Sequence, residues 1–182
     1  MEYFRTEILD VLVIKPKVFK DDRGYFLETY KEKELNDFLG FEVNFCQENE
    51  SKSSFGVLRG LHFQNPPFSQ AKLVRVIQGN ILDVVVDIRK GSKTFGKHIS
   101  IELNEINKKQ LFIPRGFAHG FLVLSETAIV SYKVDNLYNP DYEDGIMFND
   151  EMLNIDWKIS YDEIILSEKD LKYKPFKSMN VQ

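Results

Sequence analysis

Three polar side chains interrupt apolar runs of the sequence, at positions from which they could act together on one small molecule. His62 closes the run 57–62, Lys72 precedes the run 73–77, and Tyr132 lies within a third run. An imidazole, an ammonium group or a phenol that faces the interior must be paired or must titrate. A base, an acid and a cation that stabilises an enolate oxygen would together suit proton transfer beside a carbonyl.

Each of these residues also has a structural interpretation, and the residues alone leave both open. His62 can be a core histidine, Tyr132 a core tyrosine with a bonded hydroxyl, and Lys72 a side chain that extends to water. Arg59 lies three residues before His62, so on an ideal strand the two point to opposite faces. Both can serve one pocket only if Gly60 permits a bulge or twist.

Other chemistries lack support in the sequence. It contains neither a Gly-x-Ser-x-Gly elbow nor a glycine-rich nucleotide loop, so acyl transfer and nicotinamide or ATP mechanisms are disfavoured. The three histidines, 62, 98 and 119, lack the spacings of zinc or iron sites, and we expect no metal. His98 is expected at the surface, and Cys46 as a small buried hydrophobe.

The elements that must position these residues are mostly short strands. Alternation in 97–103 places Ile99, Ile101 and Leu103 on one face, and the segments 73–77 and 81–88 flank Gln78-Gly79-Asn80, which predicts an antiparallel hairpin. Many short strands imply a sandwich or a closed barrel. The other strands are predicted at 11–14, 25–30, 57–62, 110–113, 117–124 and 128–134.

Two helices are predicted beside the strands. The segment 31–39 has apolar residues on one face and ends at Gly40, and a second short helix is expected to begin at Ser167. We expect the chain after Lys174 to be loosely ordered.

Composition limits the class of protein. The 182 residues are 43% hydrophobic with a formal net charge of −4, which predicts one domain spanning 1–182 and disfavours nucleic-acid binding. No apolar stretch approaches the roughly 20 residues needed to span a bilayer, and a single cysteine suits a reducing compartment. We therefore expect a soluble, cytoplasmic protein without membrane partners.

Several motifs, spread in order over nearly the whole chain, resemble the dTDP-4-dehydrorhamnose 3,5-epimerase family. Because the match is so long, it is specific. The motifs are Asp22-Arg23-Gly24-Tyr25-Phe26-Leu27-Glu28, Gln47-Glu48-Asn49, Gly56-Val57-Leu58-Arg59-Gly60-Leu61-His62, Gln70-Ala71-Lys72, Gly116-Phe117-Ala118-His119-Gly120, Tyr132-Lys133, Tyr138-x-Pro140-x-x-Glu143-x-Gly145 and Leu166-Ser167-Glu168-Lys169-Asp170.

The resemblance implies an all-β fold, a cupin-type jelly-roll barrel with a few short peripheral helices, that works as a homodimer without metal or organic cofactor. It implies that His62 is the general base and that Asp170 orients and polarises it. Tyr132 would be the acid that delivers a proton to the opposite face of the sugar ring. Lys72 would stabilise the enolate at O4.

The resemblance also implies a set of substrate-binding residues. Tyr138 would stack on thymine, with a surface aromatic as the alternative interpretation. Arg23 and Glu28 lie in a segment that the family exchanges across its dimer, so they are expected to serve the partner subunit's site. The full set is Arg23, Glu28, Gln47, Asn49, Arg59, Lys72, His119, Tyr138, Glu143 and Lys169.

The expected reaction converts dTDP-4-dehydro-6-deoxy-D-glucose to dTDP-4-dehydro-β-L-rhamnose by epimerisation at C5 and C3, in dTDP-L-rhamnose or related deoxysugar biosynthesis that feeds lipopolysaccharide and O antigen. Two alternatives remain open. One is an epimerase that acts at a single carbon or on another nucleotide-linked 4-keto sugar. The other is a non-catalytic sugar-binding barrel, since this scaffold hosts many functions.

Overall fold

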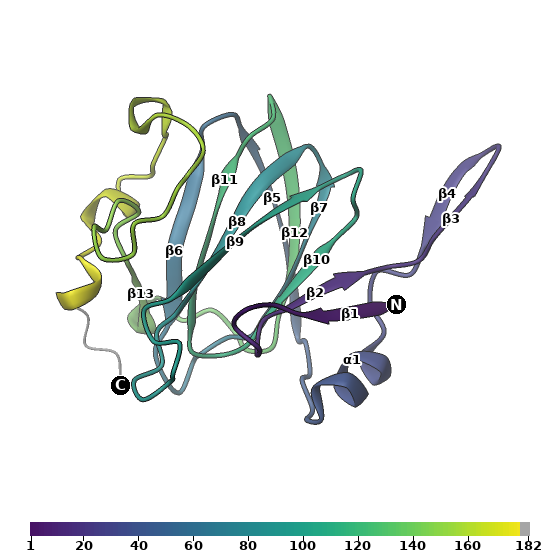
Figure 1. Cartoon of the computed structure of the whole chain (residues 1–182), viewed down its shortest axis with the longest axis horizontal. Coiled ribbons are helices and arrows are strands. Elements are labelled where there is room, and N and C mark those ends of the chain that lie inside the picture. Colours follow the sequence, from purple (N-terminus) through teal and green to yellow (C-terminus); the bar gives the residue numbers. More distant parts are fainter. Residues whose placement is uncertain (179–182) are drawn as a thin grey trace.

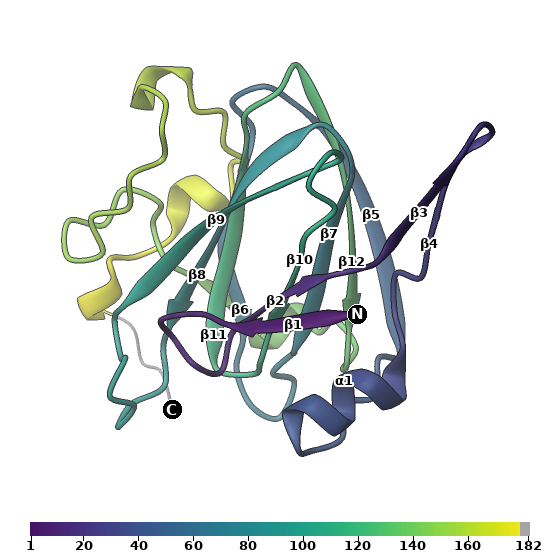
Figure 2. The ribbon, with the colours of Figure 1, turned by 45° about the vertical axis from the view of Figure 1, so that its right-hand side comes forward.

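Two antiparallel β-sheets face each other across the core of the computed structural model, which describes residues 1–178 (Figures 1 and 2). The first sheet has the strand order β1-β2-β10-β7-β12-β5 and the second the order β13-β6-β11-β8-β9. Successive strands such as β7 and β8 lie in different sheets, as in a jelly roll. The prediction of an all-β, cupin-type jelly-roll barrel is confirmed.

Each of the nine predicted strand segments contains a strand with similar bounds, but the sequence analysis did not predict β1, β3, β5 and β13. The first sheet contains β1 (Glu2–Arg5), β2 (Leu12–Lys15), β5 (Gln47–Ser54), β7 (Lys72–Gln78), β10 (Gln110–Ile113) and β12 (Thr127–Val134). The second contains β6 (Leu58–Gln64), β8 (Asn80–Asp87), β9 (His98–Asn104), β11 (Phe117–Val123) and β13 (Glu143–Gly145). A separate hairpin of β3 (Val18–Asp21) and β4 (Gly24–Leu27) projects from the barrel (Figure 1).

The predicted hairpin between 73–77 and 81–88 is wrong. β7 pairs with β10 and β12, whereas β8 pairs with β9 and β11, so neither strand has a free edge for the other. Gly79, with φ of 83°, turns the chain from one sheet to the other at a point where an added Cβ would lie 2.1 Å from the Thr127 carbonyl oxygen. The glycine signal for a turn was sound, but the partners of the two strands come from distant sequence.

The helices are short and lie outside the barrel. The predicted helix is α1 (Glu32–Leu39), and Gly40 ends it in the left-handed conformation. The helix expected from Ser167 is a single 3-10 turn, η3 (Asp170–Lys172), in which the Ser167 hydroxyl accepts from the Asp170 amide at 3.1 Å. The other 3-10 turns are η1 (Pro140–Tyr142), η2 (Tyr161–Glu163) and η4 (Phe176–Ser178).

Two local predictions need correction. The chain after Lys174 is ordered through η4, because Phe176 is buried and its amide donates to Asp150 at 2.7 Å; residues 179–182 lie outside the described part. Cys46 is exposed rather than buried, because it precedes β5 at the edge of the first sheet. Within residues 1–178, no helix combines the length and apolar character needed to cross a membrane.

The strand faces that point into the space between the two sheets are apolar. Ile99 and Leu103 of β9 are buried and Ser100 is exposed, as the alternation predicted. The main cluster includes the buried residues Val74, Val76, Val85, Leu103, Leu111, Phe121, Ala128 and Val130. At about 25 cal/mol per Å² of apolar surface removed from water, this interior is the main stabilising contribution.

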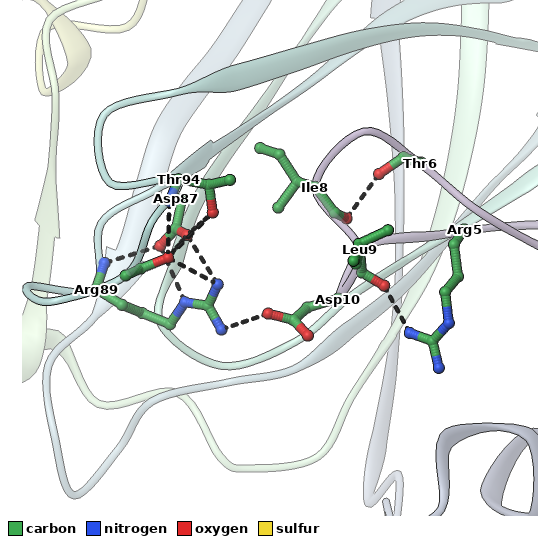
Figure 3. A network of polar contacts seen from close by, with 9 residues as sticks. Arg5, Thr6, Ile8, Leu9, Asp10, Asp87, Arg89 and Thr94 are labelled. Carbon is green, nitrogen blue, oxygen red and sulfur yellow. Dashed lines mark hydrogen bonds and ion pairs between the residues drawn. The ribbon is translucent and has the colours of Figure 1, made fainter.

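A polar network ties the loop between β1 and β2 to the end of β8 (Figure 3). Asp87 is at its centre and is fully buried. Its carboxylate accepts from Arg89, Ser92 and Thr94, and Arg89 also donates to Asp10 at 2.8 Å. Burial would raise the pKa of Asp87, but these hydrogen bonds lower it to about 2. The network therefore fixes the carboxyl end of a central strand.

Candidate active site

Four strands from both sheets deliver polar side chains to one cleft. Two adjoining cavities, of about 520 Å³ and about 470 Å³, make up the cleft, and Ser51, Arg59, His62, Lys72 and Tyr132 line both. The two cavities share these five residues, so the imidazole, the phenol and the ammonium group face one space. The structure therefore brings together the three groups that the sequence analysis expected in one pocket.

Strand alternation explains why Lys72 and Tyr132 face inward. Lys72 shares a face of β7 with Val74 and Val76, which are 0% and 4% exposed in the core between the sheets. Tyr132 packs against the same cluster, which also contains Val130 from its own strand. Both side chains therefore continue an apolar face to the point where it opens into the cleft.

Gly60 allows Arg59 and His62 to serve the same cleft, as the sequence required. Its φ is 125°, and the pairing of β6 with β11 shifts register at this point. A Cβ at Gly60 would lie 2.5 Å from the Gly120 Cα, so only glycine fits between the strands. The irregular strand turns both side chains toward the cavities, and Arg59 also donates to Ser53 at 3.0 Å.

His62 is held by a carboxylate from outside the barrel. Its Nε2 lies 2.5 Å from Asp170 Oδ1, and the side chains of His62 and Asp170 are 28% and 5% exposed. Burial raises the pKa of Asp170, but the hydrogen bonds from His62 and Ser167 and the nearby charge of Lys169 together outweigh burial, so the pKa is lowered. An ionised carboxylate only accepts hydrogen bonds, so Nε2 carries a proton, and in the neutral imidazole the lone pair is on Nδ1.

A second histidine–aspartate pair lies beside the first. His119 is paired with His62 across β11 and β6, and its Nε2 lies 3.0 Å from both carboxylate oxygens of Asp83. Both members are buried, and burial lowers the pKa of His119 despite the opposing effect of Asp83. Sequence reasoning missed Asp83, although a carboxylate inside the apolar run 81–88 requires a buried partner.

Burial changes the titration of the other two central groups. Desolvation lowers the pKa of Lys72 to about 8, although Asp83 and Glu143 favour its charge. Desolvation also raises the pKa of Tyr132, against the effects of Arg59 and Asn49, its cross-strand neighbour. At neutral pH the lysine is therefore mostly an ammonium group, and the phenol is a neutral hydrogen donor.

The remaining predicted residues fall into two groups. Gln47, Asn49, Tyr138 and Glu143 line the second cavity, and Lys169 lines the first. The Tyr138 hydroxyl donates to Glu143 Oε2 at 2.6 Å, and Lys169 forms an ion pair with the same oxygen.

Arg23 and Glu28 are not brought to the cleft of their own chain. The Arg23 side chain is 90% exposed near the tip of the projecting hairpin, where it pairs with Asp21 at 2.5 Å. Glu28 pairs with Lys31 at 2.7 Å. Residues 1–178 hold no group of three or more His, Cys, Asp or Glu side chains placed to bind a metal ion.

The fold and the cleft together define a class: a cupin-type jelly-roll barrel with a histidine, a tyrosine and a lysine around one polar cavity. A family model described as dTDP-4-dehydrorhamnose 3,5-epimerase matches residues 5–178. The chain belongs to this family.

Individual relatives agree over nearly full length. A dTDP-4-dehydrorhamnose 3,5-epimerase of Escherichia coli K12 is 51% identical over 170 residues, which is 93% of this chain and 91% of the relative. The crystal structure of the enzyme of that name from Elizabethkingia anophelis is 52% identical, with a TM-score of 0.95 and coverage of 99% and 98%. A Legionella pneumophila 3,5-epimerase crystallised with dTDP-4-keto-L-rhamnose is 42% identical, with a TM-score of 0.94 and coverage of 98% and 94%.

Proposed function

We propose that this protein epimerises C5 and C3 of dTDP-4-dehydro-6-deoxy-D-glucose to give dTDP-4-dehydro-β-L-rhamnose. One observation carries the proposal: His62 and Tyr132 line the same cleft, with Lys72 beside them. Relatives named as 3,5-epimerases at 51% and 52% identity support the two-carbon reaction over a single epimerisation. The reaction needs only proton transfers beside the C4 ketone.

His62 removes the proton in this mechanism. Because Asp170 accepts from Nε2, the lone pair on Nδ1 is available to the substrate, and the carboxylate stabilises the imidazolium that forms. The His62 side chain is 28% exposed, so it can exchange its proton with solvent between steps. Asp170 acts through His62 and does not itself take the proton.

Lys72 and Tyr132 complete each epimerisation, which begins when His62 removes the proton. As the proton leaves C5 or C3, negative charge develops on O4, and the Lys72 ammonium stabilises it in a partly desolvated site. Tyr132 then delivers a proton to the opposite face of the enolate, which inverts the carbon. Its raised pKa keeps the phenol protonated until the carbanion demands the proton.

The remaining cleft residues suit the nucleotide. Arg59 and Lys169 offer cations to the diphosphate, and Tyr138, 55% exposed, presents an aromatic face for the thymine ring. Gln47, Asn49, His119 and Glu143 supply further polar contacts around the sugar and nucleotide. Because Glu143 already pairs with Tyr138 and Lys169, substrate would exchange these contacts for its own.

We also propose that the whole chain is one domain that works as a homodimer with exchanged N-terminal segments. Arg23 and Glu28 lie on or beside a hairpin that leaves its own barrel, and that hairpin carries the exposed aromatics Phe19, Tyr25 and Phe26. Such a hairpin suits delivery of Arg23 to the partner's cleft. The lone Cys46 agrees with a cytoplasmic enzyme of rhamnose supply for lipopolysaccharide and O antigen.

Mixed dimers test the exchange. If Arg23 serves the partner, R23A and H62N are each inactive as homodimers, but refolded together they form dimers with one intact cleft. The expected result is recovery of activity in the mixture. A mixture no more active than its components contradicts the exchange.

Deuterium oxide tests the reaction itself. Incubating the enzyme with dTDP-4-dehydro-6-deoxy-D-glucose should place deuterium at both C5 and C3 of the product, as read by NMR. Deuterium at one carbon alone would assign a single-site epimerase, and tight binding without any exchange would assign a non-catalytic binding protein.

A further inference from the structure

One aromatic residue outside the cleft contacts the general base. Tyr173 directly follows η3, the turn that carries Asp170, and its ring meets the His62 ring edge to face, with centroids 5.5 Å apart and an interplanar angle of 66°. The same short segment therefore holds the imidazole twice: by a carboxylate at Nε2 and by a rigid ring against its side.

A glycine makes room for this contact. Gly145 of β13 is paired with His62 of β6, and a Cβ at this position would lie 2.5 Å from the Tyr173 ring. The Tyr173 ring therefore occupies the space beside His62 that a side chain at 145 would fill. The proposed mechanism assigns no role to Gly145 or Tyr173.

The hydroxyl of Tyr173 does not explain its placement. The oxygen is buried and has no hydrogen-bond partner among residues 1–178. Burial, together with the neighbouring Glu143 and Asp170, raises the pKa of Tyr173, so the phenol stays neutral. The described residues that line the two cavities do not include Tyr173. The useful part of the side chain is therefore its ring.

We propose that Tyr173 is a positioning residue, whose ring fixes the plane of the His62 imidazole so that Nδ1 faces the sugar. This inference rests on the proposed function, in which His62 is the base. An imidazole held only by one hydrogen bond can still rotate about that bond. An edge-to-face contact with a rigid ring removes this freedom.

The test compares Y173F, Y173L and Y173M by steady-state kinetics with the 4-keto sugar nucleotide. Y173L and Y173M fill space without a rigid edge, and kcat should fall by about 10- to 100-fold, because misplacing a reacting group by about 1 Å can cost about 100-fold in rate. KM should stay within about twofold, because Tyr173 does not line the cleft. Y173F keeps the ring and should retain kcat within about twofold.

Tyr161 provides a matched control. Its ring meets Phe148 edge to face at the same centroid distance, 5.5 Å, and at 73°. Y161L removes an equivalent contact away from His62, so it should leave kcat unchanged, and thermal melting of all variants separates lost stability from lost positioning. If Y173L unfolds, Y173M is used as the test variant in its place.

Three results would overturn the inference while the native enzyme is active: wild-type kcat in folded Y173L or Y173M, equal losses in Y173F and Y173L, or a rise in KM alone. An inactive native enzyme would instead contradict the proposed function.

Discussion

Two histidine–aspartate pairs lie side by side in this barrel, and they differ in exposure and in how the carboxylate meets the imidazole. His62 is 28% exposed and is bonded to one oxygen of a carboxylate that arrives from η3. His119 is 8% exposed and faces both oxygens of Asp83, which lies on the adjacent strand β8. Both members of the first pair line the first cavity, whereas in the second pair His119 lines it and Asp83 does not.

The difference shows how the same two side chains serve chemistry or structure. A base must exchange protons with substrate and solvent, which requires exposure and a carboxylate that stabilises the charged form. The His119 pair is desolvated, and burial lowers the pKa of His119, so it remains a neutral hydrogen-bonding group. We therefore expect the proton transfer to depend on the first pair, whereas the second pair stabilises the barrel and holds His119 as a neutral contact for the substrate.

The largest expected effect is the loss of the base. H62N should lower kcat by about 10² to 10⁴, the usual contribution of general base catalysis, whereas H119N should lose less than about 10-fold because it removes one hydrogen-bonding group. Steady-state kinetics on both variants measures the contrast. Equal losses would break the distinction between the two pairs.

The next effect separates the two carboxylates. D170N should lower kcat by about 10- to 100-fold, because the imidazolium loses its counter-charge. D83N should lower the free energy of unfolding by about 1–3 kcal/mol, because a buried hydrogen bond is disturbed. Urea unfolding and kinetics on each variant measure both quantities. A D170N variant that loses stability but not rate would reverse the assignment.

A smaller effect concerns pH, because Lys72 lies near Asp83. The ammonium form is active, and its pKa of about 8 predicts that kcat/KM falls as pH rises through 8, to about one tenth at pH 9. Asp83 raises the pKa of Lys72, so D83N should move this limb to lower pH. A pH–rate profile for wild type and D83N measures the shift, and an unchanged limb would remove Lys72 from the mechanism.

The smallest expected effect is at the nucleotide end. Y138F keeps the aromatic face but loses the hydroxyl that donates to Glu143, so KM should change by less than about threefold, since an exposed hydrogen bond contributes about 0.5 kcal/mol. Y138A removes the ring, and KM should rise by at least about 5-fold, as base–aromatic stacking contributes about 1–3 kcal/mol. Similar values for the two variants would contradict stacking.

The sequence predicted the positions of the strands that carry the site better than it predicted which strands pair with each other. Alternation correctly oriented Lys72 and Tyr132, because a half-buried strand repeats every two residues. It failed for the hairpin around Gly79, because partner choice depends on strands far away in sequence. β5 was missed because its sequence, QENESKSS, is polar at the sheet edge.

Some contacts in the site could not be predicted from local sequence patterns. No spacing rule connects His62 to Asp170, 108 residues later, and only the family resemblance suggested this contact. The sequence analysis assigned Asp83 and Tyr173 no role, because the importance of both depends on burial beside a histidine that folding alone brings near. Cys46 was misplaced because composition favours burial, while a sheet edge leaves its residues exposed.

The central claim, that His62 and Tyr132 act from opposite faces of one sugar ring, is tested most directly by deuterium exchange in two variants. In deuterium oxide, Y132F should exchange substrate protons through His62 without inverting the carbon, and H62N should exchange none. Exchange that persists in H62N, or is abolished in a folded Y132F, would contradict the account.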